Sequence, residues 1–167
     1  MLNSKKTFKA AVLFEQNKPL KVIDLQFPEK LEKGQLLVKI ISAAICGAQI
    51  GEIRGVKGPD KWLPHCMGHE GYGIVVAKNS SSKKVKVNDK VILHWRKGSG
   101  LNAKPANYLS KKYGQINAGQ VTTFQEYAVV SENRVVMKAG CLDLESAVLF
   151  GCALATGAGM AVHEIKA

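Results

Sequence analysis

Cysteine and histidine side chains are the groups in this sequence most able to bind a transition metal or to act as nucleophiles. The sequence contains four cysteines and four histidines. They are Cys46, Cys66, Cys141, Cys152, His65, His69, His94 and His163. No Cys-x-x-Cys pair occurs, which argues against a zinc ribbon and against a thioredoxin-like redox motif. Because an isolated intracellular cysteine is ordinarily a buried small hydrophobe, spacing alone gives weak support to a metal site.

The local sequence around three of these residues favours a joint site. Cys46-Gly47 closes an expected strand, where the backbone can turn and present a thiolate. His69 lies in the segment Gly-His-Glu-Gly at residues 68–71, where small residues flank a His-Glu pair and a strand follows. Cys152 follows Leu-Phe-Gly near the start of an expected late helix. Context therefore strengthens the case for a metal site beyond what spacing alone provides.

In this order, the segments resemble the zinc-dependent medium-chain alcohol dehydrogenases. The resemblance rests on Cys-Gly at the end of the third expected strand, Gly-His-Glu about twenty residues later, and Gly-Cys-x-x-x-Thr-Gly at residues 151–157. Residues 123–127, Thr-Phe-Gln-Glu-Tyr, resemble the family's Thr-Phe-Ala-Glu-Tyr strand. Residues 87–91, Val-Asn-Asp-Lys-Val, resemble its Val-Gly-Asp-Arg-Val turn. The resemblance extends over nearly the whole chain.

The resemblance implies a catalytic zinc held by Cys46, His69 and Cys152, with a fourth coordination position open to water or substrate. Glu70, beside the histidine, would orient the ligands from outside the coordination sphere or bind the metal transiently. Two thiolates would neutralise the zinc charge and leave a Lewis acid that binds an alkoxide without trapping it. The implied substrate is a small alcohol or aldehyde, and hydride transfer would use NAD or NADP.

Several departures from the family pattern bear on this chemistry. The family's proton-accepting Ser or Thr is Ala48 here, its ligand-orienting Asp is Gln49, and its relay histidine is Gly51. The usual proton relay is therefore not expected, and a zinc-bound water or another group would have to serve. Residues 95–120 correspond in position to the family's four-cysteine structural zinc lobe but contain no cysteine. We expect one catalytic-type zinc site and no structural zinc.

Short strands must position these residues. Apolar runs rich in β-branched residues predict strands at residues 8–15, 20–27, 36–41, 73–77, 90–93, 124–130 and 134–137. Residues 95–120 contain several glycines and little periodicity, so we expect a long excursion there. The pattern predicts a mainly β fold. The resemblance makes it a GroES-like β-barrel with short helices, followed by truncated linker helices.

The pattern changes after residue 142, where Asp143 is the expected N-cap of a helix. We expect a GroES-like catalytic domain at residues 1–142 and a helical stub at residues 143–167 that leads to an absent Rossmann domain. Gly157-Ala158-Gly159 does not replace that domain, since it follows helical sequence and lacks the third glycine of a nucleotide-binding turn. A second chain would supply the NAD(P)-binding domain, and the uncovered apolar face of the helices predicts self-association.

Composition and charge limit the other classes of function. With 46% hydrophobic and 22% charged residues, the sequence is that of a globular protein, not a disordered one. No apolar run approaches the ~20 residues that cross a bilayer, and no signal peptide follows the first methionine, so a cytoplasmic location is expected. The formal net charge is +11. The lysines are scattered, and their densest stretch, residues 78–86, contains no aromatic residue for base stacking, so nucleic acid is not the expected partner.

Three functions remain open at this point. The first is the zinc-binding catalytic portion of an alcohol dehydrogenase-like oxidoreductase, unable to transfer hydride without a nucleotide-binding domain. The second is a stand-alone GroES-like binding or interaction module without redox activity, and the third is a basic nucleic-acid-binding β-barrel. Trp62, Trp95 and Tyr108 are candidates to line a pocket, although ordinary packing explains each of them equally well.

Overall fold

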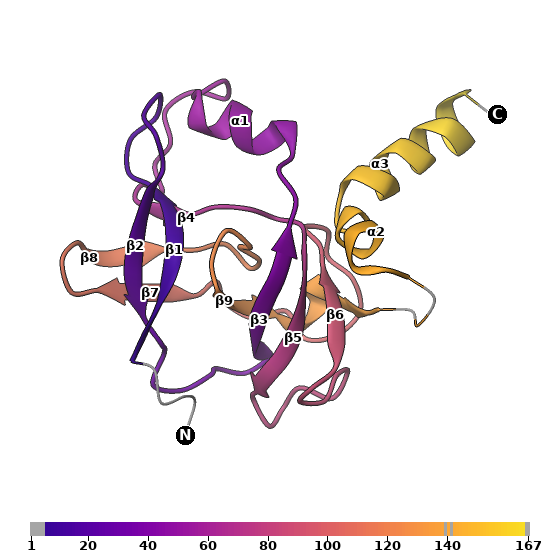
Figure 1. The fold of residues 1–167 in the computed structure, drawn as a ribbon, viewed down its shortest axis with the longest axis horizontal. Helices are drawn as coiled ribbons and strands as arrows, with labels where there is room; N and C mark the ends of the chain where they lie inside the picture. The colour runs from indigo at the N-terminus through magenta and orange to yellow at the C-terminus, as the bar shows by residue number, and fades with distance from the viewer. Residues whose placement is uncertain (1–5, 139, 141, 166–167) are drawn as a thin grey trace.

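A computed structural model describes residues 6–138, 140 and 142–165 of the chain (Figure 1). Cys141 lies outside the described residues. So do residues 1–5 of the predicted catalytic domain and residues 166–167 of the predicted helical stub. Within the described residues, two five-stranded sheets are formed. Their strands are β1 (Thr7–Leu13), β2 (Lys21–Gln26), β3 (Gln35–Ala43), β4 (His65–Cys66), β5 (Gly71–Lys78), β6 (Lys90–Leu93), β7 (Asn107–Ser110), β8 (Gly114–Asn117), β9 (Tyr127–Ser131) and β10 (Val135–Met137).

The first sheet, with strand order β2-β1-β4-β8-β7, packs around an aromatic core. Alternate residues of β1 point inward, so Phe8, Ala10 and Val12 are buried. The ring of Phe8 packs edge-on against Tyr108, with the ring centroids 5.5 Å apart. Val12 pairs with Cys66 of β4, which fixes the strand that leads toward His69.

The second sheet has the order β10-β6-β5-β3-β9, and each of its strand pairs is antiparallel. β3 lies between β5 and β9, and its residues Leu36 and Val38 are fully buried in a core with Val75. The two sheets meet where Ala10 of β1 pairs with Gln125, just before β9. This pairing joins the two sheets.

Short helices lie at the edges of the barrel. The helices are α1 (Gly47–Ile53), a 3-10 helix (Glu132–Arg134), α2 (Leu144–Leu149), α3 (Ala153–Gly159) and a π-helical segment (Met160–Ile165). α1 follows β3, whereas α3 and the π-helical segment project away from the sheets (Figure 1). α2 packs through Ala147 and Val148 on Tyr72 and Ile92 of the second sheet. No helix within the described residues has the length and apolar composition needed to cross a lipid bilayer.

The structure confirms the mainly β architecture with short helices and corrects details of the sequence prediction. The predicted N-cap is present, because the Asp143 carboxylate accepts a hydrogen bond of 2.6 Å from the backbone N–H of Ser146. The strand predicted at residues 124–130 begins only at Tyr127, since the N–H groups of Thr123 and Phe124 both donate to the carbonyl of Met67.

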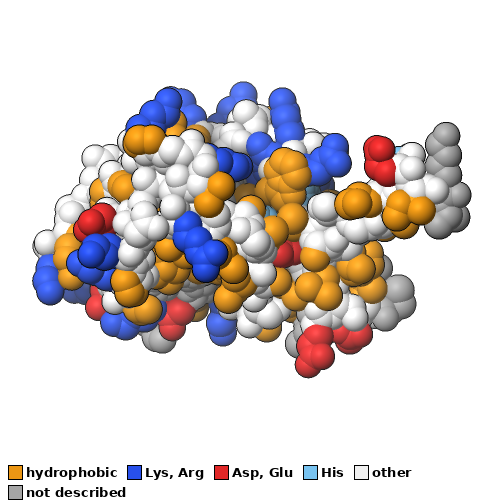
Figure 2. All heavy atoms as spheres, turned by 90° about the horizontal axis from the view of Figure 1, so that it is seen from above, with side chains coloured by type: hydrophobic (Ala, Val, Ile, Leu, Met, Phe, Trp, Pro, Cys, Tyr) orange, Lys and Arg blue, Asp and Glu red, His pale blue; other side chains and the backbone are white. Residues whose placement is uncertain are grey.

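Residues 95–120 are less irregular than predicted, because they contain the β7–β8 hairpin of the first sheet. The lysine-rich stretch connects β5 to β6, as expected for a turn between strands. On the face shown in Figure 2, Lys and Arg side chains occur in several separate groups rather than in one continuous stripe. The third function, nucleic-acid binding, gains no support from this face.

Candidate metal centre

Cys46 lies at the point where β3 has ended and α1 begins. It is the N-cap residue of α1, and its extended backbone (φ −93°, ψ 150°) turns the chain out of the sheet. Its backbone N–H donates a hydrogen bond of 3.1 Å to Oε1 of Gln49, one turn into the helix. This local bond fixes the direction in which the thiol leaves the backbone.

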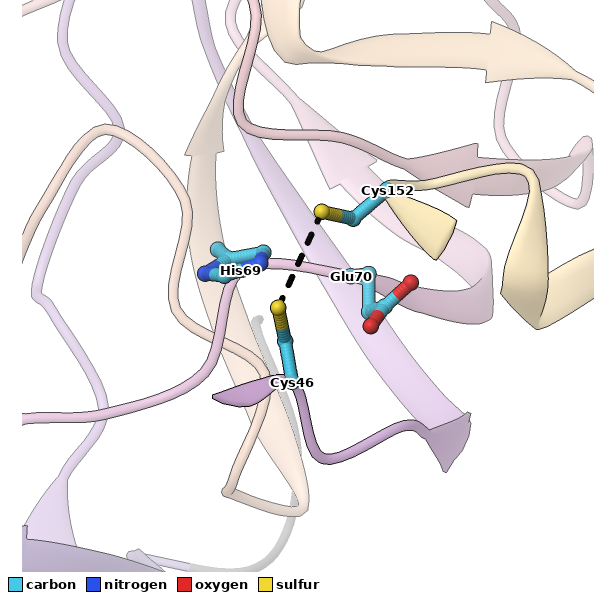
Figure 3. Close-up of side chains that lie close together, drawn as sticks. All are labelled: Cys46, His69, Glu70 and Cys152. Atoms are coloured by element: carbon cyan, nitrogen blue, oxygen red, sulfur yellow. Dashed lines mark hydrogen bonds between the residues drawn. The ribbon is translucent and has the colours of Figure 1, made fainter. Parts of the chain in front are cut away.

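His69 and Glu70 lie in the connection between β4 and β5. Gly68, immediately before them, has a left-handed φ of +89°, and a Cβ at this position would lie 2.7 Å from the ring of Phe124. Only glycine meets both requirements without strain, because the left-handed region and the close approach each disfavour a side chain. The turn at Gly68 directs His69 toward the end of β3, where Cys46 lies (Figure 3).

Cys152 lies between α2 and α3, as the N-cap residue of α3. The chain reaches this position through Gly151, whose Cα packs directly on the β4–β5 connection: a Cβ there would lie 2.6 Å from Cβ of Glu70. The carboxylate of Glu70 accepts a hydrogen bond of 3.2 Å from the backbone N–H of Ala153. Glu70 therefore ties the segment that carries Cys152 to the segment that carries His69.

The structure brings together all four residues that the sequence singled out. Possible ligand atoms of Cys46, His69, Glu70 and Cys152 all lie within 4.8 Å of one another. The two sulfur atoms are 4.0 Å apart and face each other, with the imidazole beside them (Figure 3). Two thiolates bound tetrahedrally at ~2.3 Å from a zinc ion would be about 3.8 Å apart, close to the observed separation.

The imidazole of His69 offers a free nitrogen to this cluster. Its Nδ1 contacts the side-chain amide of Gln49. Its Nε2 is buried and has no hydrogen-bond partner among the described residues. A buried polar atom without a partner is costly unless something binds it, so the donor set fits a metal ion.

The electrostatics of the cluster also favour a cation. Burial raises the pKa of the Cys152 thiol, and the neighbouring Cys46 raises it further. Burial lowers the pKa of His69, although the negative charge of Glu70 opposes the shift. The imidazole is therefore held in its neutral, metal-binding form, and a divalent ion would relieve the repulsion between two adjacent thiolates.

Two cavities, of about 480 and about 640 Å³, meet at this cluster and share Gln49, Glu52, Trp62 and His69 in their walls. Ala48 and Cys152 line the larger one. Volumes of this size suit a small organic ligand.

The three aromatic residues that the sequence offered as pocket walls differ in their positions. Trp62 lines both cavities, and Trp95 lines the larger one. Tyr108 is a core residue, whose hydroxyl accepts a hydrogen bond of 2.7 Å from the N–H of Val129. The structure therefore places two of the three at a cavity.

Most of the other cysteines and histidines lie apart from the cluster. Cys66 is buried in the core of the first sheet, and burial raises the pKa of its thiol to about 12. His94 lines a separate small cavity of about 160 Å³, and His163 is exposed in the π-helical segment. His65 belongs to a second group, with Glu52 and Asp60, that sequence reasoning did not identify.

Comparison with known proteins identifies the family. Residues 32–140 match the alcohol dehydrogenase GroES-like domain. The chain belongs to this family. It is also 32% identical, over 183 aligned residues, to alcohol dehydrogenase 6 of Peromyscus maniculatus, in an alignment that covers 95% of this chain and 48% of that protein. The GroES-like chain thus spans about half the length of the curated relative that it matches.

Solved structures agree with the GroES-like assignment. An alcohol dehydrogenase zinc-binding domain protein from Burkholderia ambifaria has a TM-score of 0.81 at 19% identity, covering 96% of this chain and 49% of that one. Benzyl alcohol dehydrogenase from Acinetobacter calcoaceticus has a TM-score of 0.77 at 23% identity, covering 97% of this chain and 49% of that one. The predicted alcohol dehydrogenase resemblance and the predicted GroES-like fold are both confirmed.

Proposed function

We propose that this chain is the zinc-binding catalytic portion of a medium-chain alcohol dehydrogenase-like oxidoreductase, in which Cys46, His69 and Cys152 hold one zinc ion. The observation that carries the proposal is the convergence of two thiols, 106 residues apart in sequence, on a buried imidazole nitrogen without a partner. Family membership supports it, since two cysteines and one histidine are the catalytic zinc ligands of alcohol dehydrogenase.

A zinc ion bound there would supply a Lewis acid that stabilises negative charge on a substrate oxygen. The chain's own residues fix the geometry around that oxygen. Glu70 acts from outside the ligand set, because its carboxylate already accepts the N–H of Ala153 and so holds Cys152 in place relative to His69. Gln49 holds Cys46 and His69 in the same way from α1.

The proton released from an alcohol leaves by an unusual route in this proposal. Ala48 lines the larger cavity beside Cys152 and His69, but it has no hydroxyl to receive a proton. We infer that a water molecule in the cavity accepts the proton, because a proton acceptor must lie within hydrogen-bond reach of the donor. A small alcohol or aldehyde is the proposed substrate, in keeping with the volume of the two cavities.

The proposed cofactor is NAD or NADP, bound by a nucleotide-binding domain that lies outside residues 1–167 and that a second chain could supply. Residues 1–142 would then form the catalytic domain, and residues 143–167 the start of the linker. Exposed apolar side chains on α3 and the π-helical segment support contact with a second domain or self-association of the chain. These side chains are Leu154, Met160, Val162 and Ile165. A cytoplasmic location completes the proposal.

Metal analysis of the purified full chain tests the ligand assignment. We expect about one zinc per chain, lost in Cys46→Ser and in His69→Ala, and retained in Cys66→Ala, whose thiol lies in the core of the first sheet. With Co²⁺ in place of zinc, the site should show a sulfur-to-cobalt charge-transfer absorption that disappears in Cys46→Ser. Stoichiometric zinc in the His69→Ala variant would contradict the assignment.

A second measurement separates the oxidoreductase from the stand-alone module. The zinc-loaded chain should not reduce NAD(P)⁺ by itself, but it should oxidise a small alcohol when combined with the nucleotide-binding half of a relative. A zinc-loaded chain that stays inactive in a stable complex of this kind would favour the binding module.

A further inference from the structure

A second group of potential metal ligands lies beside the first, and the function proposed above gives it no metal to bind. Ligand atoms of Glu52, Asp60 and His65 lie within 4.8 Å of one another. We propose that these three residues bind a second divalent transition-metal ion, with Nε2 of His65 and the two carboxylates as ligands. The site would fasten the connection between α1 and β4 to the first sheet.

His65 is already oriented as a metal ligand. Its backbone is fixed on both sides, because β4 pairs with Leu13 of β1 and with Asn117 of β8. Its Nδ1 donates a hydrogen bond of 2.9 Å to the carbonyl of Cys66, and the residue is buried. Metal-binding histidines are typically anchored in this way through the nitrogen that does not bind the metal. The remaining nitrogen, Nε2, faces the two carboxylates.

Asp60 is anchored in a corresponding way. Its Oδ1 accepts a hydrogen bond of 2.8 Å from the backbone N–H of Trp62, and its own N–H donates to Oε1 of Gln16. The other oxygen, Oδ2, accepts a hydrogen bond of 2.8 Å from Nε2 of His65. Burial raises the pKa of Asp60, but hydrogen bonds from Trp62 and His65 outweigh this and keep it below its usual value. The carboxylate is therefore ionised, and Oδ2 would exchange its hydrogen bond with His65 for a bound cation.

Glu52 completes the group from α1. Its Oε1 lies 3.8 Å from Nε2 of His65, and its side chain is partly exposed, so it can adjust its position. Oxygen and nitrogen ligands about 2.0 Å from a tetrahedral metal are about 3.3 Å apart. The two distances from Nε2, 2.8 Å to Asp60 and 3.8 Å to Glu52, lie on either side of this value. A small rotation of both carboxylates would therefore admit an ion.

The chemistry of the three ligands indicates which ions are suitable. An ion bound at Nε2 would displace the proton that this nitrogen donates to Asp60, and the proton would pass to solvent. The two carboxylates would then carry two negative charges, which a divalent ion neutralises. An imidazole ligand favours Zn²⁺, Co²⁺ and similar first-row ions over Mg²⁺ and Ca²⁺, which prefer oxygen ligands only. The absence of sulfur distinguishes this group spectroscopically from the site at Cys46.

The position of the group explains what a bound ion would do. Residues 54–64 connect α1 to β4 without a strand or helix and contain two glycines with left-handed φ, Gly55 and Gly58. Asp60 belongs to this connection, Glu52 to the preceding helix and His65 to the following strand. One ion held by all three would join the connection at its beginning, middle and end. It would also stiffen the wall of the cavity that His65 and His69 share.

The test uses the full chain with the Cys46→Ser and Cys152→Ser substitutions, which remove the first site. Isothermal titration with added Zn²⁺ should then give about one equivalent of binding, weaker than that of the thiolate site and therefore lost from the chain during purification. Asp60→Asn or Glu52→Gln should weaken this binding at least a further tenfold. Both changes keep the size of the side chain, and Glu52→Gln affects a partly exposed group that the fold does not require. Asp24→Asn, in an exposed ion pair with Lys9, is the matched control and should bind as before.

Co²⁺ distinguishes this proposal from the function proposed above. In the otherwise unmodified chain, Asp60→Asn should leave the sulfur-to-cobalt absorption intact, whereas the double cysteine variant should bind Co²⁺ without it. No binding of Zn²⁺ by the double cysteine variant, or equal binding after Asp60→Asn and Glu52→Gln, would overturn the second site and leave the first unaffected.

Discussion

Gly151 lies directly against Glu70. A Cβ at residue 151 would be 2.6 Å from Cβ of Glu70 and 2.5 Å from the carbonyl oxygen of Leu93, so the position has no room for a side chain. This contact sets how deeply the segment that carries Cys152 sits on the second sheet. The separation of the two sulfur atoms therefore depends on a glycine that has no metal-binding group of its own.

Replacing Gly151 by alanine should displace Cys152 from Cys46. We expect zinc affinity to fall at least tenfold and the free energy of unfolding to fall by about 1–3 kcal/mol, the usual cost of overpacking. Chelator competition and urea denaturation would measure the two effects. Gly157→Ala is the matched control, because a Cβ there meets no atom within 4 Å. A zinc affinity equal to that of the unmodified chain would show that the contact does not position Cys152.

Replacing Gln49 by glutamate should strengthen zinc binding. A carboxylate can accept hydrogen bonds from both the N–H of Cys46 and Nδ1–H of His69, which leaves Nε2 unprotonated for the metal. Partners of this kind typically change metal affinity by about 10–100-fold. Chelator competition would measure the gain, with the exposed Gln115→Glu as a control for added charge. Equal gains in both variants would point to net charge rather than to the contact.

Removing the hydroxyl of Tyr108 should destabilise the fold and leave zinc binding unchanged. The N–H of Val129 donates to this hydroxyl at 2.7 Å, and Nε2 of Gln125 donates at 3.3 Å. Tyr108→Phe leaves both buried donors without this acceptor, which costs about 1–3 kcal/mol. Urea denaturation would detect the loss, and Tyr113→Phe serves as the comparison. A change in zinc affinity with normal stability would instead assign Tyr108 to the site.

The stability of the fold should decrease in alkaline solution partly because of Cys66. Burial raises the pKa of its thiol to about 12, from 9.0 in an unstructured chain. Between these values the unfolded chain loses the thiol proton while the folded chain keeps it, so rising pH favours unfolding. The contribution is about 1.4 kcal/mol per pH unit. Urea denaturation from pH 9 to pH 11 should show a shallower decline in Cys66→Ala, and identical slopes would refute the assignment.

The sequence predicted seven of the ten strands within the described residues, and the order of the candidate ligands, because both depend on local patterns. The short strands β4, β7 and β8 were not predicted. Alternating apolar residues predict β1. Gly68 beside His69 and Gly151 beside Cys152 indicate that the backbone there packs closely on its neighbours. α1 was missed because a seven-residue helix with glycines at positions 47 and 51 has little helix propensity. Helix α1 lies directly after β3, and the side chain of its residue Gln49 contacts both Cys46 and His69. The contacts that Gln49 makes with these two ligands were therefore missed as well.

Contacts between distant loops could not be predicted from the sequence. The hydrogen bond of Glu70 to Ala153 spans 83 residues, and that of Asp60 to Gln16 spans 44. Neither pair has a local sequence signal, since each depends on the path of connections that contain glycines with left-handed φ. The second metal site was missed for the same reason.

The pairing of Ala10 with Gln125 governs how this chain can fold as it is synthesised. The two residues that join the sheets are separated by more than one hundred positions, and β3 likewise pairs with β9, which is synthesised much later. Until the segment near residue 130 has left the ribosome, β1 and β3 each have an edge without its final partner. Such edges can pair with other chains, so slow completion of synthesis should favour aggregation or chaperone binding of the nascent protein.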